Sequence, residues 1–399
     1  MKAPQKLYHN YLFIFGFIFY FILPLCVVLT SSFSNYPGMD YLYKYYNKSF
    51  ASLYCIIIIS LLLSFICGSL LPLKFTKIKK DIPKKEFVFG NRDLFLILIP
   101  FFLYAQVFIF MNRGSLFQGY LVEYNTQFMG NIATLNTLFI FWLLYYKSKN
   151  DNSNTFFSYF LFFCITEFSI VLLGLGSRMY ILVPLVSYLI YLLEAQKITI
   201  KKLIVNTILA ILFFLCIGVW RLGDKISIDG MLYIGFAEPC LTWISAESMF
   251  TLNDSIPLFA IPYNFLTSFI NFIPSILIPN KSTLIEPIAL SYDSPFGATN
   301  LLLSLISNFG ILGSCIFLFS MGFILTYIRI NCHSLFFKTY YLCICGILPF
   351  QFFRDGFSVT NKMLIYNLLI FPFIFILIEK ILYIKSKFIR NNENKNTSN

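Results

Sequence analysis

Charge is what this sequence most clearly lacks. Only 12% of its 399 residues are charged, whereas a soluble globular domain carries about 25%. Hydrophobic residues make up 58% of the chain, and they recur in apolar runs of about twenty residues, the length of a transmembrane helix. The alternating ten-residue segments of a membrane β-barrel are absent. The sequence therefore predicts an all-α polytopic membrane protein. Its net charge of +12 reflects the basic bias of such proteins and does not indicate a nucleic-acid partner.

Histidine and metal-binding motifs are also scarce. The only histidines are His9 and His333, and there is no HExxH, GxGxxG or Walker sequence. No Asp-x-Asp pair is present to hold a metal with a nucleotide sugar. Cys343 and Cys345 have neither CxxC spacing nor a neighbouring histidine, and Cys240 is alone in the longest polar interval. The sequence therefore predicts no metal site, no cofactor and no disulfide.

The apolar runs predict about ten transmembrane helices in a single membrane domain, residues 1–399. No small-residue cleavage site follows the first run, so we expect it to be retained and not to be a signal peptide. A basic polar tail covers residues 384–399. The predicted spans lie at about 11–30, 51–72, 94–111, 132–146, 155–173, 179–193, 203–220, 309–328, 339–352 and 363–383.

The distribution of basic residues predicts the orientation. With the N-terminus inside, 21 of the 30 Lys and Arg residues fall on the inner face and nine on the outer face. Basic residues gather on the cytoplasmic side of membrane proteins. We therefore expect both termini to be cytoplasmic, and both histidines to lie on the inner face.

The interval 221–297 is the longest polar stretch, and it is predicted to form one large external loop. It holds seven of the eighteen acidic residues and seven of the sixteen prolines. A loop of this length in a compact bundle is usually functional. Residues 257–279 within it are apolar enough for an eleventh span, but four prolines and two asparagines interrupt them. A re-entrant or surface-lying segment is favoured, because lipid cannot replace the hydrogen bonds that proline removes.

Arginines are the candidate functional residues of the outer face. Arg178 precedes a span in GLGSRMY, Arg221 follows a span, and Arg354 lies in FFRDGF between two spans. Arginine presents a planar, permanently charged fork that fits phosphate oxygens, so these residues are candidate ligands for a pyrophosphate. The alternative is that each arginine extends to the membrane surface or pairs with a nearby acid. That simpler reading is preferred for Arg113 and Lys281.

Among the acids, Glu238 lies in an apolar part of the predicted loop, in YIGFAEPC. Burial there would raise its pKa and suit it to act as a general base. Asp355 is the rival candidate, although an ion pair with the preceding arginine is its simpler explanation. Glu247 and Asp293 are further candidates. Glu167 falls within a predicted span and is expected to face the interior of the bundle.

At these residues the chain resembles the Wzy-type O-antigen polymerases, which polymerise oligosaccharide repeat units. In that family an arginine follows Gly-Ser at a span boundary, a proline-rich segment ends near Pro-x-Lys, and Asn-Phe-Gly-x-x-Gly opens a span. The resemblance covers most of residues 155–375, and the first 150 residues match only in hydropathy. The matching positions are Gly176–Arg178, Pro279–Lys281, Asn308–Gly313 and Arg354.

The resemblance implies a GT-C-type membrane fold and a bacterial inner-membrane glycosyltransferase whose large loop faces the periplasm. The enzyme would move a growing glycan from undecaprenyl pyrophosphate to a new lipid-linked repeat unit. Its partners would be these lipid-linked oligosaccharides, membrane lipid and a chain-length regulator protein. The catalytic candidates are then Arg178, Arg221, Arg354 and Glu238, and the substrate-binding candidates are Asp355, Glu247, Lys281 and Asp293.

Other functions remain open. An O-antigen ligase would share the donor, but that family carries a functional histidine in its large loop, and 221–297 contains none. A membrane acyltransferase would also need a well-placed histidine. A lipid-oligosaccharide flippase would show polar residues along a central cavity and would have more spans. A purely structural membrane subunit is the remaining alternative.

Overall fold

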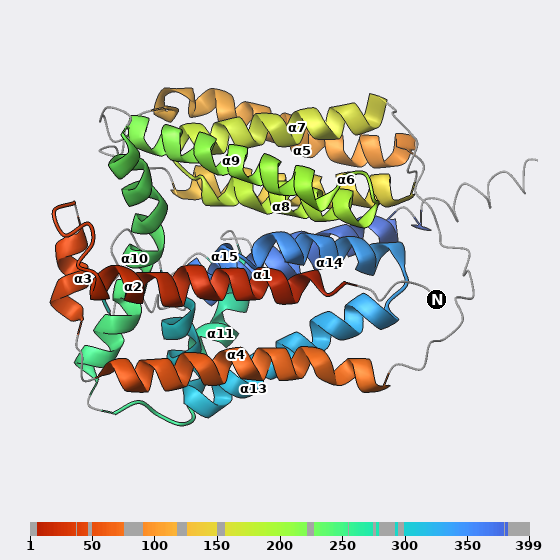
Figure 1. Cartoon of the computed structure of the whole chain (residues 1–399). Helices are drawn as coiled ribbons and strands as arrows, with labels where there is room; N and C mark the ends of the chain where they lie inside the picture. Colours follow the sequence, from red (N-terminus) through yellow and green to blue (C-terminus); the bar gives the residue numbers. More distant parts are fainter. Residues whose placement is uncertain are drawn as a thin grey trace, which may run out of the picture.

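The computed structural model describes residues 6–36, 38–46, 50–75, 91–117, 126–149, 156–221, 227–253, 255–273, 277–278, 292–293, 299–378 and 380–381. Across these residues the secondary structure is helical, and no strand occurs. Figure 1 shows a layered bundle of long helices that lie nearly side by side, with one helix crossing an end of the bundle.

The long helices of the bundle are α1 (Tyr8–Phe17) with η1 (Ile18–Ile22) and α2 (Leu23–Leu29), α4 (Ala51–Phe75), α5 (Asn91–Met111), α6 (Thr126–Lys149), α7 (Phe156–Gly174), α8 (Met179–Glu194), α9 (Ile200–Arg221), α13 (Leu301–Asn331), α14 (Leu335–Ile347), and α16 (Phe357–Asn361) with η7 (Lys362–Ile370). The remaining elements are α3 (Met39–Tyr45), η3 (Arg113–Ser115), α10 (Ile228–Leu252), α11 (Tyr263–Thr267), η4 (Ser268–Phe272) and α15 (Gln351–Arg354).

Helix length and hydropathy identify an integral membrane protein, as the sequence predicted. Seven helical segments of the described chain are long and apolar enough to cross a membrane, and three shorter apolar helices accompany them. These helices coincide with the predicted apolar runs, because such runs can satisfy their backbone only as helices in lipid. The crossing number of ten and the orientation of the termini stay predictions. The shorter helices lie in the ranges Phe95–Met111, Met179–Glu194 and Leu335–Ile347.

Small residues allow the long helices to pack closely. A Cβ atom added at Gly322 of α13 would collide with the carbonyl oxygen of Phe65 in α4, and one added at Gly68 would collide with the backbone of Phe319. Helices in lipid gain little from the hydrophobic effect and associate through close contacts of this kind. The α4–α13 pair is therefore held by backbone proximity at these two glycines.

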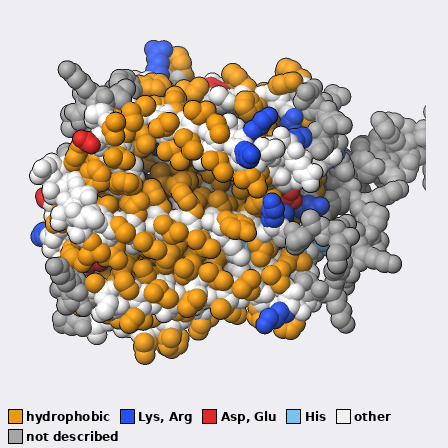
Figure 2. Space-filling model, in the orientation of Figure 1, with side chains coloured by type: hydrophobic (Ala, Val, Ile, Leu, Met, Phe, Trp, Pro, Cys, Tyr) orange, Lys and Arg blue, Asp and Glu red, His pale blue; other side chains and the backbone are white. Residues whose placement is uncertain are grey.

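Polar side chains within the bundle have partners on neighbouring helices. The Gln106 amide of α5 donates a 2.7 Å hydrogen bond to Glu167 of α7, so the acid predicted within a span is satisfied by an adjacent helix. At the end of the bundle near the N-terminus, Arg329 of α13 pairs with Glu194 of α8 at 2.8 Å. Figure 2 shows that on this face most Lys and Arg side chains gather at the same end.

The helix that crosses the bundle is α10, at the end opposite the N-terminus (Figure 1); we call this the α10 end. It packs against α2, α3 and α9. Ser227 caps its first turn by accepting a 3.1 Å hydrogen bond from the Gly230 amide. Trp243 is fully buried and donates a 2.8 Å hydrogen bond to the Tyr54 hydroxyl of α4. The first part of the interval 221–297 is therefore a packed helix, where the sequence suggested a loop.

Residues 255–273 pack against a break in α13. The carbonyl oxygens of Pro257 and Leu258 accept 3.0 Å hydrogen bonds from the amides of Ile311 and Leu312. Gly310, directly before these two amides in α13, has a φ of 70°. A Cβ atom added to it would lie 2.6 Å from the backbone of Leu258. Only glycine adopts this conformation readily, so Gly310 opens α13 for the incoming segment.

The same segment contains only two short helices, α11 and η4. The Asn308 carboxamide anchors it by accepting a 2.8 Å hydrogen bond from the Phe265 amide, and Asn361 donates a 2.8 Å hydrogen bond to the Ser268 hydroxyl. A spanning helix is not formed within the described residues 255–273, which supports the predicted re-entrant or surface-lying segment. The motif Asn-Phe-Gly at residues 308–310 thus acts as its docking point.

Candidate active site near the α10 end

Arg354 is positioned by three separate parts of the chain. It ends the four-residue helix α15, which follows α14 after a short turn. The Gln351 side chain at the start of α15 donates a hydrogen bond to the Met179 carbonyl at the start of α8. The Arg354 carbonyl accepts a 3.0 Å hydrogen bond from the Thr299 amide, just before α13 begins. The arginine is therefore held where α8, α13 and α15 meet.

Two carboxylates face the Arg354 guanidinium. Its Nε atom forms an ion pair with Glu238 in the middle of α10, and its Nη1 atom is 3.2 Å from Asp355 Oδ1. We call these three residues the ion cluster; its formal charge is −1. The side chains of Arg354 and Glu238 are 22% and 26% exposed, although the two atoms that form their ion pair are buried. The Asp355 side chain is only 9% exposed.

Burial and charge act in opposite directions within the ion cluster. Burial raises the pKa of the Asp355 carboxyl, and the adjacent guanidinium works against that rise. Burial lowers the pKa of Arg354, but Glu238 and Asp355 raise it by more, so the net shift is upward. Arg354 is therefore a permanent cation, and it is the group that allows two acids to lie together at this depth.

Aromatic side chains enclose the ion cluster. The Tyr180 side chain of α8 contacts Asp355. Tyr20 of η1 is completely buried, and its ring stacks on Phe353 with centroids 5.9 Å apart. Within the part of the chain that the structure describes, the Tyr20 hydroxyl has no hydrogen-bond partner. Tyr20 could not be predicted as a site residue because it lies in an ordinary apolar run, whereas Tyr180 is close to the predicted Gly-Ser-Arg motif.

The Gly-Ser-Arg motif forms the turn between α7 and α8. Gly176 has a φ of 85°, and the Ser177 amide donates a 2.8 Å hydrogen bond back to the Leu172 carbonyl, as in a glycine-terminated helix. Arg178 directly precedes α8 as its N-cap residue. Its guanidinium occupies the space that Gly218 of α9 leaves free, beside Ile234 of α10. Ile234 is one helical turn before Glu238, so Arg178 lies near the ion cluster.

The remaining predicted site residues are not shown to lie at the ion cluster. Arg221 is the last residue of α9, three residues beyond Gly218, and its side chain is outside the described residues, as is Lys281. Glu247 is buried on α10, nine residues beyond Glu238 and therefore about 13 Å further along the helix. Asp293 is exposed, and no hydrogen bond or ion pair among the described residues joins it to the ion cluster.

Glu247 differs electrostatically from Glu238. Burial raises its pKa to about 8, whereas Glu238 pairs with a cation.

Arg113, for which a simple interfacial position was preferred, lies over the Phe110 ring at 4.7 Å. The structure therefore unites Glu238, Arg354 and Asp355, with Arg178 nearby, and leaves Glu247 and Asp293 apart.

A family comparison identifies the class of protein. The model of the family described as O-antigen polysaccharide polymerase Wzy matches residues 4–302, about three quarters of the chain. The chain belongs to this Wzy family. No curated protein and no solved structure gives a significant match. The polymerase match includes Arg178, Arg221 and Glu238, and it extends through the first 150 residues, where sequence inspection found only a hydropathy likeness.

Arg354 and Asp355 lie beyond the matched region. They contact the matched region through the ion pair between Arg354 and Glu238, because α15 returns to the end of the bundle where α10 lies. As a member of the Wzy family the protein is an O-antigen polymerase embedded in a membrane.

Proposed function

We propose that this polymerase transfers a growing glycan from undecaprenyl pyrophosphate to a second, undecaprenyl-pyrophosphate-linked repeat unit, and that the ion cluster is its active site. The observation that carries the proposal is the pairing of two partly exposed side chains, Glu238 and Arg354, near the end of the bundle that is opposite the basic end (Figure 2). On the predicted orientation this is the periplasmic face of the inner membrane, with both termini in the cytoplasm.

The reaction needs a proton acceptor and a stabilised leaving group. A hydroxyl oxygen of the acceptor sugar bonds to the anomeric carbon of the donor glycan. The bond from that carbon to the phosphate oxygen breaks, and undecaprenyl pyrophosphate leaves with the electron pair. The hydroxyl proton passes to the Glu238 carboxylate, which later loses it to water. Since the donor already carries its leaving group, no nucleotide is consumed.

The charges of the site suggest a division of roles. Glu238, held by its ion pair with Arg354, would act as the general base. Because Arg354 is already neutralised by two carboxylates, Arg178 and Arg221 would provide additional positive charge for the pyrophosphate. Arg354 would contribute to that stabilisation once Glu238 has taken up the proton. Asp355 holds the guanidinium in place.

The predicted substrate-binding residues outside the ion cluster would serve the glycans. We assign Asp293 and Lys281 to contacts with sugar hydroxyls, because they belong to the interval that follows α10. Glu247 is enclosed by its neighbours, so its contribution would come through the position of α10 and not through direct contact with sugar.

Reconstitution tests the proposal directly. The purified protein in liposomes is given a lipid-linked repeat unit of its own O-antigen, and products are separated by length. We expect a ladder of polymers with the wild type and none with Glu238→Gln. The double variant Arg329→Gln/Glu194→Gln, which removes an ion pair at the opposite end, should retain the ladder. A full ladder from Glu238→Gln would exclude that residue as the base.

A further inference from the structure

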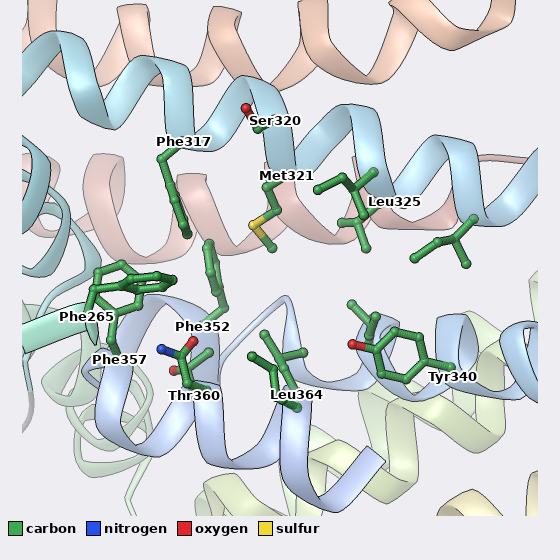
Figure 3. A pocket seen from close by; sticks show the side chains of 15 residues that line it. Phe265, Phe317, Ser320, Met321, Leu325, Tyr340, Phe352, Phe357, Thr360 and Leu364 are labelled. Carbon is green, nitrogen blue, oxygen red and sulfur yellow. The ribbon is translucent and has the colours of Figure 1, made fainter. Parts of the chain in front are cut away.

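An apolar groove lies between α13, α14 and the helix formed by α16 and η7. Its volume is about 230 Å³. Figure 3 shows Phe317, Met321 and Leu325 of α13 facing Thr360 and Leu364 across it. Nearly all of the lining side chains are hydrophobic. None of the three residues of the ion cluster lines the groove.

The groove opens sideways, toward the surface that would face lipid. Ser320 and Ile324 of α13 are on its rim; the Ile324 side chain is 54% exposed, and Ser320 is also exposed. Along α13 the lining extends from Phe317 to Ile328, about 16 Å at the rise of an α-helix. An occupant could therefore enter from the membrane without passing through the protein.

One end of the groove adjoins the ion cluster. Phe352 and Phe357 both line the groove, and they flank Arg354 and Asp355 in the chain. Thr360 also lines it, and its hydroxyl donates a 3.1 Å hydrogen bond to the Asp355 carbonyl. The other end approaches Ile328, next to Arg329, at the basic end of the bundle. The groove therefore runs from the candidate active site into the depth of the membrane.

We propose that this groove holds the isoprene units next to the pyrophosphate of one lipid-pyrophosphate substrate, with that pyrophosphate at the arginines of the site. The rest of the polyprenyl chain would continue into the lipid through the open side of the groove. The inference rests on the proposed function and adds to it the place of the lipid. A long, narrow, apolar occupant with a multiply charged head matches a groove that begins beside Arg354 and continues between aliphatic and aromatic walls. An ordinary phospholipid chain would fill the same space without a head group fixed at the arginines.

The polyprenyl chain gains packing and orientation in the groove more than it gains hydrophobic burial. Outside the groove it would lie in a bilayer that is as apolar as the protein. Filling the groove should therefore weaken the advantage of a long polyprenyl chain without removing the chemistry. Met321→Trp fills the groove from α13. Ile316→Trp is the matched control: it places the same side chain on the same helix at a residue that is 59% exposed and does not line the groove.

The kinetic test compares repeat units linked to undecaprenyl pyrophosphate with the same units linked to dimethylallyl pyrophosphate, whose single isoprene unit is too short to extend along the groove. Wild type and Ile316→Trp should prefer the long chain. In Met321→Trp the KM for the long-chain substrate should rise about fivefold or more, since contacts along the chain are lost, while the KM for the short-chain substrate stays unchanged. An unaltered preference in a folded Met321→Trp protein would overturn the groove assignment.

A direct measurement covers the case in which Met321→Trp fails to fold. A photo-crosslinking amino acid is placed at residue 320 on the rim, or at residue 316 as the control, and labelled undecaprenyl pyrophosphate is added in phospholipid vesicles. We expect label at 320, displaced by unlabelled undecaprenyl pyrophosphate, and little at 316. Equal labelling at both positions, or crosslinks to phospholipid alone, would contradict the proposal. If the wild type polymerised no lipid-linked repeat unit, the proposed function itself would fail instead.

Discussion

Removing the Arg354 guanidinium should destabilise the protein through the acids it leaves behind. Arg354→Met keeps a long apolar side chain but leaves Glu238 and Asp355 without their cation. Breaking a fully buried pair from one side costs about 3–5 kcal/mol. The paired side chains here are 22% and 26% exposed, so water compensates in part, and we expect a loss of about 2–4 kcal/mol. Adding Glu238→Gln to Arg354→Met should recover about 1–2 kcal/mol, because one of the uncompensated charges is then gone.

Thermal unfolding of the purified protein in detergent measures this effect. The control is the corresponding pair of variants at the other end of the bundle, Arg329→Met with and without Glu194→Gln. They should show the same recovery in stability, but only the variants of the ion cluster should also lose polymer formation. An Arg354→Met protein as stable as the wild type would show that the two acids do not depend on this cation. So would a double variant that is less stable than Arg354→Met alone.

Three further predictions concern α10, α13 and the α4–α13 contact. Glu247, with its pKa of about 8, keeps its proton in the folded state between about pH 4.5 and 8 while the unfolded chain ionises, so folding stability falls as the pH rises through this window. Glu247→Gln should remove that loss, which is of order a few kcal/mol. Melting curves at pH 5 and pH 8 should therefore show a gain in stability mainly at pH 8. Gly310→Ala should lower the free energy of unfolding by about 1–3 kcal/mol because of the φ of 70° at this residue and the adjacent Leu258 backbone. The control Gly130→Ala, whose added Cβ meets no atom within 4 Å, should be neutral or slightly stabilising. Equal melting temperatures for the two variants would contradict the break assigned to α13 at Gly310. Gly322→Leu should separate α13 from α4 at Phe65 and lower the melting temperature strongly. The control is Leu312→Ala on the exposed side of the same helix, which should have little effect on the melting temperature.

The helices that carry the bundle could be predicted from the sequence because lipid imposes a simple requirement. An apolar run of sufficient length must satisfy its own backbone, and it does so as a helix. The exception was α10, whose acids and Pro239 suggested a loop. The structure shows that Thr242–Phe250 is buried throughout, so tertiary contacts such as that of Trp243 with Tyr54 support a helix that has no long apolar run of its own.

The candidate site could be predicted residue by residue but not as an arrangement. Charged side chains in an apolar chain indicated Arg354 and Glu238 individually. Their pairing depends on α15 returning beside α10, which no local pattern encodes. The same limit explains why Tyr20 was missed and why Glu247 and Asp293 were grouped with residues that they do not contact. Asn308 and Gly310, by contrast, formed a recognised motif, and the structure explains it as the docking point of residues 257–273.

The ion cluster near the α10 end is proposed to carry out polymerisation. The most direct measurement is a lipopolysaccharide gel of the source strain with this gene deleted and then complemented by variants that reach wild-type levels in the membrane. Wild type and Arg329→Gln/Glu194→Gln should restore a ladder of long chains. Glu238→Gln and Arg354→Gln should give only core with a single repeat unit. A full ladder from both cluster variants, or loss of the single-unit band on deletion of the gene, would contradict the claim.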